Sequence, residues 1–168
     1  RLACLVDPFG SEGNFPEDYE FWLRAWANGA RIAKIPYYVI TWMDHGGRLT
    51  RNDPRYSEKA FHKIKSGYIA HWLKQHNPFF PDVVVWGAGR KSRKYANFLK
   101  EHGIRIRYFL DIKRRDVPGY ACYHFSKLPD PGKAFIVSYV GSLGAKEEIR
   151  SYLHGRNYTE GMDFIMAS

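Results

Sequence analysis

The chain has 168 residues, which suits one domain or two small ones, and 45% of them are hydrophobic, which excludes an intrinsically disordered chain. No apolar run reaches the roughly 18 to 20 residues that cross a bilayer, so the sequence predicts no membrane span. The net charge of +9 favours polyanionic partners, namely nucleic acid, acidic membrane or nucleotide phosphates. A basic surface that only aids solubility is an equal explanation.

The two cysteines, Cys4 and Cys122, stand alone, without a CxxC motif or a Cys/His spacing. They predict neither a zinc site nor a catalytic thiol, and they favour a reducing, cytoplasmic location in which each is a small buried hydrophobe. The chain begins with Arg1 rather than Met, and residues 2–6 have the pattern of a short buried strand rather than a signal peptide. We therefore expect a fragment of a longer protein.

The first half is predicted to be mainly helical. Residues 16–28 should form a helix, because Pro16 suits the first helical position and Gly29 suits the stop. The elements expected next are two short strands, a polar loop and a long helix, at Arg31–Ile35, Tyr37–Trp42, Met43–Arg55 and Ser57–His76. The long helix has one apolar stripe at spacings of three and four residues, made of Phe61, Ile64, Tyr68 and Trp72.

The pattern changes after the prolines of residues 78–81, and we place a linker there, between domains at 1–77 and 82–168. Val83 to Trp86 is a continuous apolar run, which is typical of a strand covered on both faces. The elements expected after it are a helix at Arg90–Glu101, strands at Ile104–Leu110, Tyr120–His124, Ala134–Val140 and Asp163–Met166, and a helix from Ala145. The alternation predicts an α/β fold with a small, three-layer, Rossmann-like parallel sheet.

Two adjacent acids, Glu17 and Asp18, begin the first predicted helix directly after a glycine-containing loop at residues 9–14. A carboxylate in a helix's first turn is held by backbone N–H groups and is well placed to act as a general base. Favourable interaction with the helix dipole is the commoner reason for acids at this position. The pair alone leaves both explanations open.

A longer set of spaced elements surrounds this pair. They are Pro16-Glu17-Asp18-Tyr19-Glu20-Phe21-Trp22-Leu23-Arg24, Gly29, Ile32-Ala33-Lys34-Ile35-Pro36, Trp42-Met43-Asp44-His45 and Arg48-Leu49-Thr50-Arg51-Asn52-Asp53-Pro54-Arg55-Tyr56-Ser57. In this order they resemble the second half of the catalytic domain of bacterial, inverting family 2 glycosyltransferases, which have the GT-A fold. The resemblance covers residues 1–77 and would make them a mainly helical remnant of such a domain.

The resemblance implies chemical roles for several residues. The acidic pair includes the family's catalytic base, which removes the proton of the acceptor hydroxyl; the matching position is Asp18, with Glu17 as the second choice. His45 matches a basic position near the metal-bound diphosphate and is a candidate metal ligand, with a surface-loop histidine as the equal alternative. Arg48 and Arg51 are candidate diphosphate contacts. A divalent metal, Mn or Mg, would stabilise the departing nucleoside diphosphate.

One departure from the family matters for activity. The family's DxD metal motif is absent, and the nearest triplet, Asp18-Tyr19-Glu20, is in the wrong place. The resemblance therefore implies a parent enzyme that transfers sugar from a nucleotide-sugar donor to a saccharide or lipid-linked acceptor, while this chain alone is inactive. It implies no nucleic-acid partner and leaves a homo-oligomer open.

The second half carries a candidate nucleotide site at a strand–turn–helix junction. The residues assigned to it are Gly87, Gly89, Ser92, Asp111, Gly141 and Gly144. The glycines of the first turn would let a phosphate approach the helix N-terminus, and the acid that ends the next strand stands where dinucleotide sites hold a ribose. The second glycine loop should reach the same edge of the sheet. Glycines that only serve tight strand–helix turns are an equal alternative.

Residues 82–168 resemble the Rossmann-like domain appended to some bacterial family 2 glycosyltransferases and, more distantly, the nucleotide-binding domain of sugar acyltransferases. The segments Gly144–Arg150 and Glu160–Phe164 carry the first comparison. An NAD(P)-dependent oxidoreductase is an alternative, in which the basic run Lys113-Arg114-Arg115 would indicate a 2′-phosphate rather than a solvated turn. A basic nucleic-acid-binding module is a further alternative, although the tryptophans stand at helical core spacing.

Overall fold

The computed structural model describes residues 13, 15–41, 43, 46–47 and 49–168. The chain divides into two compact units, Arg1–Tyr68 (unit 1) and Ile69–Ser168 (unit 2). The division falls inside helix α4 (Glu58–His76), and the linker at 78–81 stays a prediction. None of the described helices is both long and apolar enough to cross a membrane.

Unit 1 is helical where it has regular structure. Helix α2 (Glu17–Ala27) confirms the helix predicted for residues 16–28: it follows Pro16, and Gly29 stands just beyond its end with a φ of 84°. Helix α3 (Leu49–Asn52) and the 3₁₀-helix η1 (Pro54–Tyr56) occupy most of the later part of the predicted polar loop. Asp53 explains the second of these, because its side chain accepts a hydrogen bond from the Arg55 backbone N–H and caps the turn.

The two strands predicted between residues 31 and 42 do not form in the described part of the chain. Residues 31–41 have no strand structure, and their large apolar side chains are exposed, with Tyr38 fully accessible and Ile40 71% exposed. A strand needs a neighbouring strand for its backbone hydrogen bonds, and the described residues of unit 1 provide none. The strand expected at residues 2–6 lies outside the described residues.

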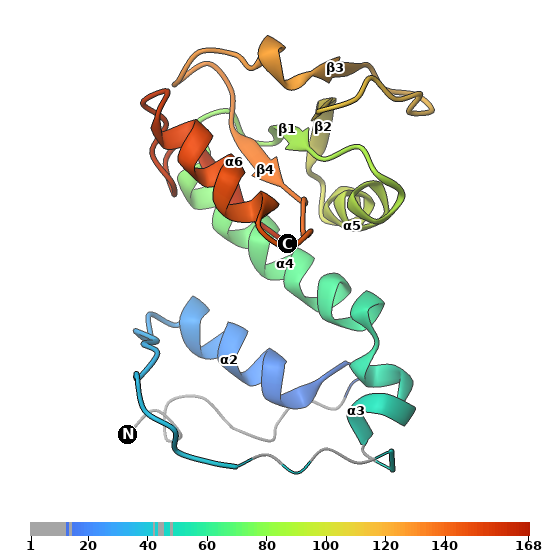
Figure 1. Cartoon of the computed structure of the whole chain (residues 1–168), viewed down its shortest axis with the longest axis vertical. Helices are drawn as coiled ribbons and strands as arrows, with labels where there is room; N and C mark the ends of the chain where they lie inside the picture. Colours follow the sequence, from blue (N-terminus) through green and yellow to red (C-terminus); the bar gives the residue numbers. More distant parts are fainter. Residues whose placement is uncertain (1–12, 14, 42, 44–45, 48) are drawn as a thin grey trace. The chain divides into compact units, whose positions relative to one another are not determined.

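Unit 2 is built around a sheet of five strands, all parallel, in the order β3-β2-β1-β4-β5. Figure 1 labels strands β1 to β4 of this sheet. The strands are β1 (Asp82–Trp86), β2 (Arg105–Asp111), β3 (Cys122–His124), β4 (Ile136–Ser138) and β5 (Phe164–Met166). The other elements are α5 (Arg90–Glu101), the 3₁₀-helix η2 (Phe125–Lys127) and α6 (Ala145–His154). This arrangement confirms the predicted α/β, Rossmann-like fold.

Both faces of the sheet are covered, which explains the continuous apolar run of β1. Val83 and Val85 belong to one core cluster, together with residues of α4 and α5, whereas Val84 and Trp86 belong to a second cluster with residues of α6. Successive strand residues point to opposite faces, so a strand between two helical layers has no solvent-facing position for a polar residue. The result is a three-layer unit with its core on both sides of β1.

Strands β3 and β4 are shorter than the sequence predicts. The apolar run at 134–140 forms a strand only at Ile136–Ser138, and the run at 120–124 only at Cys122–His124. Strand length is set by how far neighbouring strands run alongside one another, which apolar composition does not record. The predicted helix at 90–101 matches α5 at both ends.

Candidate functional site

The acids at the start of α2 have different environments, beginning with Glu17. Its Oε1 accepts a hydrogen bond from the Tyr56 hydroxyl at 2.6 Å, which links α2 to η1. This bond lowers the pKa of Glu17 below its ordinary value, and it raises the pKa of Tyr56 to about 12. Glu17 is therefore a charged acceptor that is already in use.

Glu20, one turn later, is a buried carboxylate with two side-chain partners. The Tyr68 hydroxyl donates to its Oε1 at 2.6 Å, and the Nε of Arg24 lies 3.2 Å from both carboxylate oxygens. Burial, followed by the bond to Glu20, raises the pKa of Tyr68 well above its ordinary range. A buried charge is tolerated only with such partners, so we assign Glu20 a structural role.

Asp18 lies between these two and is exposed to solvent. Its Oδ1 accepts a hydrogen bond from the Tyr19 backbone N–H at 2.7 Å, and the described chain gives its carboxylate no side-chain partner. Of the three acids in the first turn of α2, Asp18 is thus the one that has no side-chain partner among the described residues. The structure thus distinguishes Asp18 from Glu17 by their hydrogen-bond partners, which their adjacent positions in the sequence do not.

The other residues that the resemblance assigns to unit 1 are only partly described. His45 and Arg48 lie outside the described residues, and Arg51 is an exposed residue of α3. Within the described ranges, no three His, Cys, Asp or Glu side chains are grouped as a metal site requires. The described part of unit 1 therefore supplies a candidate base and no ligand set for a metal.

In unit 2 the predicted glycine turn joins β1 to α5, and Gly87 is essential to its shape. Gly87 has a φ of 108°, and a Cβ at this position would lie 2.9 Å from both Ser92 Oγ and Val140 Cγ2. Its N–H donates to the Leu110 carbonyl at 2.7 Å. Only glycine fits, because the backbone angle and the close packing both exclude a side chain.

Asp111 closes this turn from the end of β2. Its Oδ2 accepts a hydrogen bond from the Ala88 N–H at 2.8 Å and lies 3.1 Å from the Nε of Arg115, while its Oδ1 accepts from the Lys113 N–H at 3.1 Å. Both carboxylate oxygens are engaged, and the residue is buried. The acid expected to bind a ribose therefore bonds to the glycine turn itself.

The remaining predicted residues of this site gather at the same edge of the sheet or serve as caps. Ser92 Oγ donates to the Tyr139 carbonyl at 3.0 Å, which joins the start of α5 to the segment after β4. Gly144 has a φ of 80° and stands at the N-cap of α6. Nothing lies within 4 Å of a Cβ built on Gly89, so this glycine faces open space. The nucleotide-binding role of the group stays a prediction.

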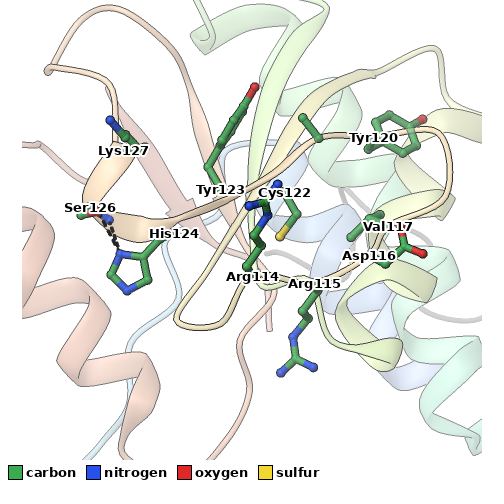
Figure 2. A pocket seen from close by; sticks show the side chains of 11 residues that line it. Arg114, Arg115, Asp116, Val117, Tyr120, Cys122, Tyr123, His124, Ser126 and Lys127 are labelled. Carbon is green, nitrogen blue, oxygen red and sulfur yellow. Dashed lines mark hydrogen bonds between the residues drawn. The ribbon is translucent and has the colours of Figure 1, made fainter.

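An open pocket of about 800 Å³ lies beside strand β3 (Figure 2), and the sequence did not predict it. It is lined by Arg114, Arg115, Asp116, Val117, Tyr120, Ala121, Cys122, Tyr123, His124, Ser126 and Lys127. Cys122, expected to be buried, is partly exposed here while packing against the core, and Cys4 lies outside the described residues. The one sequence signal for this pocket was the basic run Lys113-Arg114-Arg115, which lies between β2 and the edge strand β3.

Comparison of the chain with protein-family models, with curated proteins and with solved structures found no match.

Proposed function

We propose that residues 1–77 are the acceptor side of an inverting, GT-A-type glycosyltransferase of family 2, with Asp18 as the catalytic base. The observation that carries the proposal is the partition of acids in α2: Glu17 and Glu20 have side-chain partners, whereas Asp18 is exposed and accepts only from its neighbour's N–H. The spaced motifs of residues 16–57 add the resemblance that suggests the reaction.

In the proposed reaction, an acceptor hydroxyl oxygen attacks the anomeric carbon of a nucleotide sugar while an Asp18 oxygen takes the hydroxyl proton. The new C–O bond forms on the face opposite the leaving group, and the bond from the anomeric carbon to the phosphate oxygen breaks. The nucleoside diphosphate leaves with the bonding electron pair. Attack from the opposite face inverts the anomeric centre.

Of the residues proposed for the donor side of this reaction, Arg51 alone lies within the described part of the chain. Cations at His45, Arg48 and Arg51 would neutralise the departing diphosphate, and a bound Mn or Mg would act as a Lewis acid on it. Because the sequence has no DxD triplet, we propose that the family's metal-binding motif lies in sequence other than these 168 residues, with His45 as a candidate additional ligand. The Rossmann-like unit is proposed to be an accessory domain.

The test is made in the full-length protein that contains this chain, by measuring nucleoside diphosphate release from a panel of nucleotide sugars with manganese and saccharide acceptors. Asp18→Asn should lower kcat by roughly 100-fold or more, the usual contribution of a general base. Glu58→Gln is the matched control, because Glu58 is a first-turn acid of α4 with no role in the proposal. Full activity of a folded Asp18→Asn protein would refute Asp18 as the base.

A further inference from the structure

The glycine turn of unit 2 is poorly suited to accept an anion. Its first two N–H groups are already used, by the Leu110 carbonyl for Gly87 and by the Asp111 carboxylate for Ala88. A phosphate could bind these two N–H groups only by displacing the Leu110 carbonyl and the Asp111 carboxylate. An anion would therefore be bound better by basic side chains of unit 2 outside this turn.

The pocket beside β3 holds two such groups, Arg114 and Lys127. Both side chains line it, both are exposed, and the described chain gives neither an ion-pair partner. Arg115 differs, because its Nε is engaged by Asp111 at 3.1 Å. Asp116 is the single acid in the lining, so the pocket has an excess of positive charge.

His124 adds a directed hydrogen-bond donor to the same pocket. Its Nδ1 accepts from the Ser126 backbone N–H at 3.3 Å and lies 2.8 Å from Ser126 Oγ. An Nδ1 that accepts places the proton of the neutral ring on Nε2, which becomes the free donor. Figure 2 shows His124 and Lys127 at one end of the pocket, Arg114 in the middle and Asp116 toward the other end.

An aromatic ring completes the lining. Tyr123 is 48% exposed, and its ring is held edge-on by Tyr108 at a centroid distance of 5.4 Å. A positioned ring with free surface is suited to stack on a planar group, as aromatic side chains do in nucleotide recognition. The volume of about 800 Å³ is that of a small-molecule site rather than an ion site.

We propose that this pocket binds a small molecule that joins a phosphate ester to a planar ring, as a nucleoside monophosphate does. The phosphate lies beside Arg114 and Lys127, because a guanidinium presents paired N–H donors to phosphate oxygens. The ring lies against Tyr123. The site belongs to unit 2 alone and does not depend on the glycosyltransferase proposal.

The test is calorimetric titration of the whole 168-residue chain with two matched pairs of probes, UMP with uridine and AMP with adenosine. Each monophosphate should bind at least ten-fold more tightly than its nucleoside. The double variant Arg114→Gln/Lys127→Gln should remove that difference. The control is Arg107→Gln/Lys133→Gln at the same ionic strength, since it deletes the same charges from exposed residues outside the pocket and should keep the difference.

A second variant separates the ring from the phosphate. Tyr123→Leu should weaken UMP and AMP several-fold while leaving the binding of inorganic phosphate unchanged. No binding of either monophosphate at millimolar concentration, or equal binding of nucleosides and monophosphates, would overturn the proposal. If Gly89→Val lost monophosphate binding while Arg114→Gln/Lys127→Gln kept it, the anion would instead be assigned to the glycine turn. That glycine variant should fold, because Gly89 faces open space.

Discussion

The two units stabilise their structure by different means. Every buried hydrophobic residue of the described chain except Ala25 belongs to unit 2, where two clusters cover the faces of one sheet. In unit 1 the described large apolar residues are mostly exposed, and the elements are joined by polar contacts such as Glu17–Tyr56 and Glu20–Tyr68. The two units have a similar share of apolar residues. The comparison shows that these residues form a core only where packed strands and helices can bury them.

The largest effect on stability is expected when one apolar side chain in each unit is replaced by alanine. Phe135→Ala should destabilise unit 2 by about 3 to 5 kcal/mol, because Phe135 is fully buried and packs against Trp72 at a centroid distance of 6.0 Å. Ile40→Ala in unit 1 should change the free energy of unfolding by less than about 0.5 kcal/mol, since Ile40 is exposed. Urea unfolding measures both, and a comparable loss in the two variants would remove the contrast.

A smaller effect is expected at the polar contacts that Asp111 makes inside unit 2. Asp111→Ala leaves the Ala88 N–H without its acceptor and frees Arg115, so unit 2 should lose about 1 to 3 kcal/mol of stability. Urea unfolding again measures the loss, and hydrogen exchange of the Ala88 amide should quicken. Asp111→Asn is the control, because its amide oxygen can still accept from Ala88. An unchanged exchange rate in the alanine variant would show that Asp111 does not hold the turn.

The smallest effect is expected at an exposed polar contact of unit 1. Tyr56→Phe deletes the hydroxyl that lowers the pKa of Glu17, so this pKa should rise toward its ordinary value near 4.5. A lowered pKa stabilises the folded state above the unfolded pKa, and this stabilisation disappears as the pH falls through the folded pKa. The stability difference between the two proteins should therefore be largest at neutral pH, below about 1 kcal/mol, and should shrink under acid.

The Glu17 titration can be followed directly by NMR of its side-chain carboxyl carbon. An unchanged Glu17 pKa in Tyr56→Phe would mean that the hydroxyl is not its partner in solution. Glu147 offers an internal reference, because it is an exposed acid of α6 in the other unit and should titrate alike in both proteins.

How much of the fold could be predicted differs between the units for the same reason. The run Val83–Trp86, the glycine turn and the helix at 90–101 are local signals, and the structure confirms each of them. The strands predicted between residues 31 and 42 depend on a partner segment, and strand propensity alone does not record whether that partner is present. Pairing across the chain is therefore what local reading of a sequence misses.

The candidate sites show the same limit. Sequence position placed Glu17 and Asp18 together, but their difference depends on Tyr56, which is far along the chain. Likewise, Asp111 was expected to face a ligand, whereas its partner is Ala88, across the strand junction. The pocket beside β3 needs Arg114, Tyr123 and Lys127 to come together around an edge strand, which no spacing rule predicts.

The position of β1 in the sheet has a consequence for how the protein is made. Strand β1 pairs with β2, which follows it closely, but also with β4, which begins at Ile136. During synthesis, one edge of β1 therefore stays unpaired until β4 has been translated. One face of β1 stays uncovered for longer, until α6 has been translated. A short apolar, strand-forming run such as Val83–Trp86 is a site for intermolecular pairing in nascent chains. Truncation before β4 should thus give aggregation rather than a smaller folded domain.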